Sequence, residues 1–171
     1  MSHPSRTPLL LALSLVLSSS TAIGTSANVQ DLRLSLTCES YVEWSEQRRI
    51  ASLPLFRVFD DRGRQIFELI GYGRNFRERL DAALEKAEPD SSHRSLAAEL
   101  RLTVNLEGQP VEISPAADFT FTKYWADWCK PCHSQTEDLA LFFENQLENR
   151  DGTQITVLHI EADIGKLCRE P

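Results

Sequence analysis

The sequence has little of three things, and each shortage excludes a class of protein. Methionine occurs once, as Met1, so no methionine inside the chain is available as an axial ligand of a haem iron. Lysine and arginine number 18 against 25 aspartates and glutamates, and the net charge of −7 argues for solubility and against nucleic acid as a partner. The apolar run at 9–17 is too short to span a bilayer, and no later segment is long enough to do so.

Residues 1–27 have the pattern of a secretory signal peptide. Arg6 supplies a positive charge, the apolar run at 9–17 follows, and small residues at 22–27 offer cleavage sites. An uncleaved anchor is the alternative, whereas a lipoprotein anchor is not expected because no cysteine follows the run. We expect a periplasmic or otherwise exported protein, soluble after removal of the signal. Cysteines in such an oxidising compartment pair unless a reductant is supplied.

The remaining residues, 28–171, are enough for one compact domain. A polar break at 89–92 makes 88–100 the expected linker between parts at 41–87 and 101–163. Mixed strand and helix patterns predict the α/β class. The predicted elements are, in order, a helix at 41–51, strands at 55–59 and 65–70 joined in a hairpin, a helix at 76–87, a short strand at 102–106 with a return at 111–113, a strand at 119–125, a helix at 134–149 and a strand at 155–160.

Two cysteines, Cys129 and Cys132, lie at the junction of the strand at 119–125 and the helix after it. At a helix N-terminus, unpaired backbone N–H groups and the helix dipole favour negative charge, and both lower the pKa of a thiol there. Cys132 lies one turn further on, within reach of a mixed disulfide formed at Cys129. Pro131 suits the first turn, where a missing N–H leaves no hydrogen bond unmade. The pattern predicts thiol–disulfide exchange, with Cys129 as nucleophile and Cys132 as resolving thiol.

The stretch at 125–132, Trp-Ala-Asp-Trp-Cys-Lys-Pro-Cys, resembles the active-site motif W-A-x-W-C-x-P-C of the thioredoxin superfamily. The resemblance is nearest to periplasmic TlpA-like and Dsb-like proteins, and it covers 119–161 and, more weakly, 41–87. It implies a thioredoxin-like three-layer sandwich with a central mixed sheet. It also implies a protein-disulfide oxidoreductase with no cofactor beyond its own disulfide and no metal. Expected partners are protein thiols or disulfides and a redox partner, a membrane protein among the alternatives, and the protein is expected to be a monomer.

The chain departs from this family in the order of its parts. Too few residues follow the strand at 155–160 to form the strand opened by a cis-proline, the hairpin and the final helix that the family places there. Residues 41–87 supply such pieces earlier, with Pro54 at the position of the cis-proline. A circularly permuted domain is one interpretation. An unrelated N-terminal extension before a truncated domain is the other.

The resemblance also marks residues around the cysteines. Trp128, Pro131 and Pro54 are expected to wall the site, and Pro54 lets an extended substrate lie alongside. Lys130 favours the thiolate by its charge, or is an ordinary solvated lysine. Lys123 stands where the family often has a buried acid that moves protons for the second thiol. Its expected role is proton transfer with a pKa lowered by burial, and a lysine that reaches solvent is the alternative.

The two other cysteines, Cys38 and Cys168, flank the same opened connection in the permuted interpretation. They then come within reach of each other, and an oxidising compartment would join them in a structural disulfide. Unpaired or intermolecular thiols are the alternative.

Two other functions stay open on the sequence. Cys-Lys-Pro-Cys followed by His133 is the attachment pattern of a c-type haem, for which His93 or His159 would be the axial ligand. The other is a redox-silent thioredoxin-fold binding module. The spacing of the four cysteines does not make the paired C-x-x-C arrangement of a structural zinc site.

Overall fold

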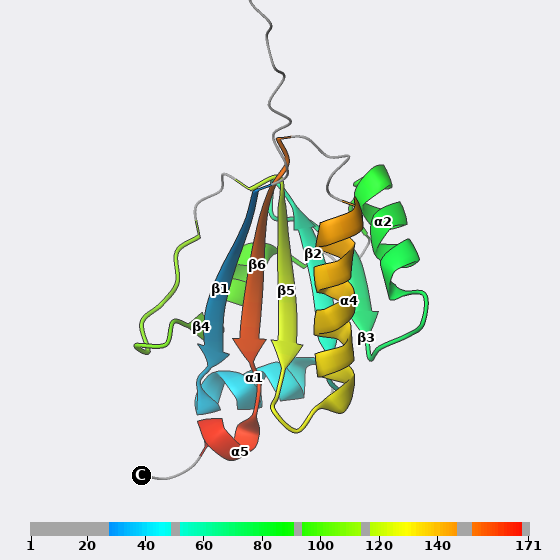
Figure 1. The fold of residues 1–171 in the computed structure, drawn as a ribbon. Helices are drawn as coiled ribbons and strands as arrows, with labels where there is room; N and C mark the ends of the chain where they lie inside the picture. Colours follow the sequence, from blue (N-terminus) through cyan, green and yellow to red (C-terminus); the bar gives the residue numbers. More distant parts are fainter. Residues whose placement is uncertain (1–27, 49–51, 91–93, 114–116, 147–151, 169–171) are drawn as a thin grey trace, which may run out of the picture.

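A computed structural model describes residues 28–48, 52–90, 94–113, 117–146 and 152–168 (Figure 1). The predicted signal peptide at 1–27 lies outside the described residues. The elements, in order, are β1 (Asn28–Leu36), α1 (Cys38–Arg48), β2 (Leu55–Asp60), β3 (Gln65–Ile70), α2 (Phe76–Lys86), α3 (Leu96–Leu100), β4 (Thr103–Val104), β5 (Phe119–Trp125), α4 (Lys130–Gln146), β6 (Gln154–Glu161) and α5 (Ile164–Leu167).

The strands form one six-stranded mixed sheet in the order β3-β2-β5-β6-β1-β4. β6 pairs in parallel with β5 on one side and with β1 on the other. The remaining pairs, β2 with β3, β2 with β5 and β1 with β4, are antiparallel. β5 and β6 therefore lie in the middle of the sheet, each with a strand paired on both edges. Most residues of both strands are buried, which suits that position.

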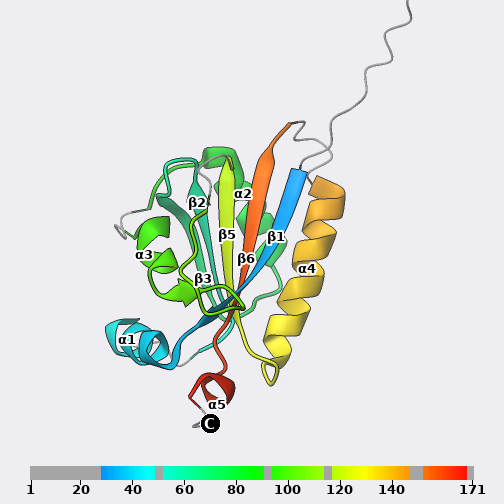
Figure 2. The ribbon, with the colours of Figure 1, turned by 90° about the vertical axis from the view of Figure 1, so that its left-hand side faces the viewer.

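Helices cover the sheet on both faces, so the fold has three layers (Figure 2). One core lies between the sheet and the helices α2 and α4, and is rich in aromatic rings such as Phe56, Phe121 and Phe142. The other lies against α1, α3 and α5, around Tyr124, Leu158 and Ile160. The α/β class predicted from the sequence is confirmed, and the sheet is mixed as expected.

The main strands and helices lie where the sequence placed them, with boundaries that differ by a few residues. The predicted hairpin at 55–70 is β2 and β3, and its turn is closed by Asp60, whose carboxylate accepts hydrogen bonds from the backbone N–H groups of Arg62 and Arg64 at 3.0 and 2.8 Å. β4 is shorter than predicted, and 111–113 forms no strand, although Val104 bridges to Pro110.

The segment at 88–100 is not the simple linker that the sequence predicted. It contains α3, whose first turn is capped by the Ser95 hydroxyl, which accepts a hydrogen bond from the N–H of Ala98. Glu99 in this helix is fully buried and pairs with the equally buried Arg57 of β2, Nη1 to Oε2 at 3.0 Å. A helix of five residues is too short to show a clear apolar period in the sequence. The polar residues around it therefore led to the prediction of a linker.

Two further elements were not predicted. β1 occupies the residues directly after the expected signal peptide, and its leucines Leu34 and Leu36 alternate into the core. That alternation is a strand signal in the sequence. α5 has only four residues and is capped by Asp163, whose Oδ1 accepts a hydrogen bond from the N–H of Gly165 at 3.0 Å.

Candidate functional site

The candidate site is the loop at 126–129 that connects the central strand β5 to α4. The carbonyl oxygen of Trp125 accepts a hydrogen bond from the N–H of Ala162, 2.8 Å away, at the end of β6. The N–H of Cys129 donates to the carbonyl oxygen of Ala126 at 3.0 Å. The N–H of Cys132 donates to the carbonyl oxygen of Cys129, also at 3.0 Å. These bonds turn the chain sharply into the helix, and they place Cys129 immediately before its first residue.

Cys129 and Cys132 form a disulfide, with their α-carbons 5.3 Å apart. Their exposed fractions are only 2% and 1%. The pair packs with Ala126, and the partly buried side chains of Leu53 and Trp125 contact this cluster. The disulfide is therefore covered by neighbouring side chains.

Leu53 brings the segment before β2 to the cysteines, although it lies far away in the sequence. The Leu53–Pro54 peptide bond is cis. Pro54 is buried, and its carbonyl oxygen accepts a hydrogen bond from the N–H of Gly71 at 2.8 Å, which fixes this segment to the end of β3. The structure thus brings the region of Pro54 to the cysteine pair, as the resemblance implied.

Of the other residues expected to wall the site, Trp128 is the most prominent. Its side chain is 62% exposed, directly before Cys129. Lys130 and Pro131 open α4 and are also exposed. The apolar surface of Trp128 is therefore free to contact another molecule beside the cysteines.

Lys123 lies on β5 beneath α4 and is only 3% exposed. Its Nζ donates a hydrogen bond to the hydroxyl of Thr136, which in turn donates to the carbonyl oxygen of Cys132 at 2.8 Å. Burial lowers the pKa of Lys123 from 10.5 to about 8. The amine is thus linked to the backbone of Cys132 through one hydroxyl, and it is easier to deprotonate than an ordinary lysine.

Two side chains that the sequence did not single out for this purpose hold the loop. Lys166 of α5 places its Nζ 2.5 Å from Oδ2 of Asp127 and 2.7 Å from Oε1 of Glu161, and both bonds raise its pKa above the ordinary value. His133 of α4 places Nε2 at 3.1 Å from the carbonyl oxygen of Asp127. The only sequence signal for the ion pair was an acid in the loop, with no indication of its partner.

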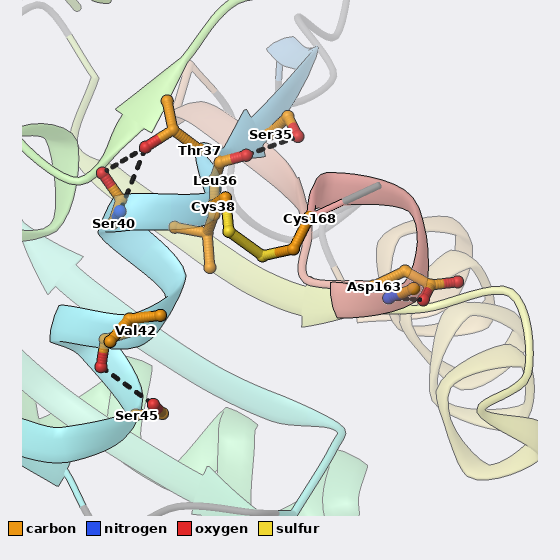
Figure 3. The surroundings of a disulfide bond; sticks show 10 residues. Ser35, Leu36, Thr37, Cys38, Ser40, Val42, Ser45, Asp163 and Cys168 are labelled. Atoms are coloured by element: carbon orange, nitrogen blue, oxygen red, sulfur yellow. Dashed lines mark hydrogen bonds between the residues drawn. A yellow bond between two sulfur atoms is a disulfide. The ribbon is translucent and has the colours of Figure 1, made fainter. Parts of the chain in front are cut away.

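Cys38 and Cys168 also form a disulfide, with α-carbons 4.9 Å apart and 130 positions between them in the sequence. Figure 3 shows the bond joining the start of α1 to the end of α5. In the structure, the two cysteines are therefore bonded to each other within one chain. Because Lys166 belongs to α5, this bond also fixes the helix that contacts the cysteine loop.

The geometry gives the haem alternative no support. His159 Nε2 lies 2.8 Å from Oδ1 of Asp31, and His93 lies outside the described residues. Within the described ranges, no group of three histidine, cysteine or acidic side chains is placed to hold a metal ion. No helix in that part of the chain is long and apolar enough to cross a membrane.

Comparisons of the chain with models of protein families, with curated proteins and with solved structures found no match.

Proposed function

We propose that this protein is an exported thiol–disulfide oxidoreductase that exchanges disulfides with protein thiols through Cys129 and Cys132. The observation that carries the proposal is the position of this pair. The two cysteines form a disulfide at the start of α4, directly after the central strand β5. A helix N-terminus stabilises a thiolate at Cys129, and the neighbouring Cys132 is placed to resolve a mixed disulfide.

The exchange is balanced by the two cysteines alone. In the dithiol form, the Cys129 thiolate attacks one sulfur of a substrate disulfide, and the other substrate sulfur leaves and takes up a proton. Cys132 then loses its proton, attacks the sulfur of Cys129 and releases the second substrate thiol. The substrate gains two electrons, and the protein ends in the disulfide form. Oxidation of a substrate dithiol is the reverse of these steps.

The surrounding residues have distinct roles in this proposal. Trp128, exposed beside Cys129, provides apolar contact for the polypeptide that carries the substrate disulfide. Leu53, the residue before Pro54, packs against the cysteines and forms another wall of the site. Lys123 accepts the proton of Cys132, because its lowered pKa leaves a fraction of the amine neutral near pH 8. The Thr136 hydroxyl lies between the two residues.

We also propose that the fold is thioredoxin-like and circularly permuted. The support is the arrangement around β5. The hairpin β2–β3 and helix α2 precede β5 in the chain, yet β2 pairs directly with β5 and α2 lies on the same face as α4. The Cys38–Cys168 bond joins the two segments that such a permutation would separate.

A disulfide-reduction assay tests the function. The mature protein should accelerate the reduction of insulin by dithiothreitol, and Cys129→Ser should abolish the acceleration. Cys132→Ser should retain the first step and accumulate a mixed disulfide with a substrate protein, visible on a non-reducing gel. Lys86→Met, a change of an exposed lysine at the end of α2, is the matched control and should keep the full rate. Full activity in Cys129→Ser would show that the nucleophile has been assigned wrongly.

A further inference from the structure

A groove of about 720 Å³ runs beside α4 on the face of the sheet that α4 covers. In Figure 1, α4 lies next to β5, and β6 and β1 face the viewer without a helix in front of them. One wall of the groove is apolar and comes from α4, with Leu139, Ala140 and Phe143. The opposite wall is polar and comes from β1 and β6. The volume is in the range of sites that hold small organic molecules.

Lys123 lines this groove, yet its side chain is almost fully buried. A buried ammonium group normally has a carboxylate partner, because removing a charge from water is costly. Within the described residues, the Nζ of Lys123 is hydrogen-bonded only to the neutral hydroxyl of Thr136. Among the residues that the structure describes, the groove therefore contains a cation without a counter-ion.

The carboxylates in the groove are already paired with other groups. Oδ1 of Asp31 lies 2.8 Å from Nε2 of His159. Oε1 of Glu161 lies 2.7 Å from Nζ of Lys166, with which it forms an ion pair. The groove has more positively charged side chains and hydrogen-bond donors than these two carboxylates can pair with. In the part of the chain that the structure describes, Arg33 has no acidic partner, and the buried indole N–H of Trp125 has no acceptor. Among the described residues, the groove thus offers two cations, Lys123 and Arg33, without a carboxylate partner and one indole N–H without an acceptor.

We propose that this groove is a binding site for a small amphipathic carboxylate, an organic acid with an apolar body. Its carboxylate pairs with the ammonium of Lys123, and its apolar body lies against Leu139 and Phe143 of α4. Neither Cys129 nor Cys132 lines the groove, but Lys123, to which the proposed function gives the proton of Cys132, belongs to both sites. Binding is measured on the oxidised protein, in which Cys132 has no proton to transfer, so the failure of this proposal and the failure of the proposed function are distinguishable.

The pairing makes the affinity depend on pH in a defined direction. The ammonium form of Lys123 is lost as the pH rises through about 8, so binding should weaken by about tenfold between pH 7 and pH 9. Within the described residues, none of the other titratable or charged groups that line the groove is hydrogen-bonded to Lys123. These groups are Asp31 and Arg33 on β1, His133 on α4, His159 and Glu161 on β6, and Lys166 on α5.

The test uses octanoate as the probe and isothermal titration calorimetry on the oxidised mature protein. We expect saturable binding of octanoate that is tighter than that of acetate, which lacks the apolar body, or of octan-1-ol, which lacks the charge. Lys123→Met should weaken octanoate binding by about tenfold or more, since a hydrogen-bonded charge is lost. Lys86→Met should not change it.

Several results would overturn the proposal. They are equal affinity for octanoate and octan-1-ol, unchanged binding in Lys123→Met, or no saturable binding at all. The pH dependence is measured on the wild-type protein, so it remains decisive if Lys123→Met does not fold. An affinity that stays constant from pH 7 to pH 9 would exclude Lys123 as the partner of the carboxylate. Insulin reduction is measured separately and tests only the thiol chemistry.

Discussion

The Nζ atom of Lys166 lies 2.5 Å from Oδ2 of Asp127, two residues before Cys129. Lys166 belongs to α5, and the disulfide between Cys38 and Cys168 fixes the end of that helix to α1. The loop that covers the Cys129–Cys132 disulfide is therefore held from outside by one ion pair, whose own anchor is a second disulfide. The following predictions test this arrangement and the buried charges of the fold.

Lys166→Met should speed the reduction of the Cys129–Cys132 disulfide by dithiothreitol, because the loop over it loses one of its contacts. Lys166 and Asp127 are 45% and 58% exposed. An exposed ion pair contributes little, so the rate should rise by no more than about fivefold. Stopped-flow tryptophan fluorescence follows the reaction, with Lys86→Met as the control. An unchanged rate would show that this contact does not limit opening of the loop.

Replacing Cys38 and Cys168 together by serine should destabilise the protein strongly. The bond spans 130 positions, and the chain-entropy model gives about 5 kcal/mol for a loop of that size. The comparison is the variant in which both Cys129 and Cys132 are serine. The disulfide that it lacks closes only a short loop, so its loss of unfolding free energy should be much smaller. Urea unfolding of the three proteins measures the difference. Equal losses in the two variants would contradict the entropic account.

Glu99→Gln should cost about 3 kcal/mol of stability, because it leaves the fully buried guanidinium of Arg57 without its buried counter-charge. Glu68, which also pairs with Arg57, is partly exposed and compensates only in part. Arg77→Gln is the control, since its contact with Asp138 is long, at 3.7 Å, and near the surface. Urea unfolding at neutral pH separates the two. A loss below 1 kcal/mol in Glu99→Gln would mean that water reaches Arg57.

Lys123→Met should change the pH dependence of stability in a predictable direction. The pKa of Lys123 is about 8 in the folded chain against 10.5 without the fold, so above pH 8 the unfolded chain binds more protons. The wild-type protein therefore gains stability relative to the variant as the pH rises from 8 to 10.5, by about 3 kcal/mol in total. Urea unfolding of both proteins at several pH values measures this gain.

Two comparisons make that pH measurement specific to Lys123. Lys86→Met, which removes an exposed lysine, should follow the wild-type protein at every pH. If the difference in unfolding free energy between the wild-type protein and Lys123→Met stays constant across this pH range, the fold does not lower the pKa of Lys123.

The sequence determined the α/β class and most of the main elements. The strands now called β2, β3, β5 and β6, and the helices α1, α2 and α4, were predicted because local apolar spacing is strong in each of them. The cysteine pair before α4 was also found from the sequence, since both residues and the helix that follows them are adjacent in the chain. β1 was not predicted, although Leu32, Leu34 and Leu36 alternate with polar residues in it.

Only the tertiary structure decided which distant side chains meet. Lys166 and Asp127 lie 39 positions apart and Arg57 and Glu99 lie 42 apart, and neither residue of either pair has a neighbour in the chain that points to its partner. Local spacing specifies which face of a strand or helix is apolar, but a charge pairs according to how the sheet orders its strands. The unpaired ammonium of Lys123 emerged for the same reason, because the sequence shows a lysine and only the fold shows that no acid stands beside it in the described chain.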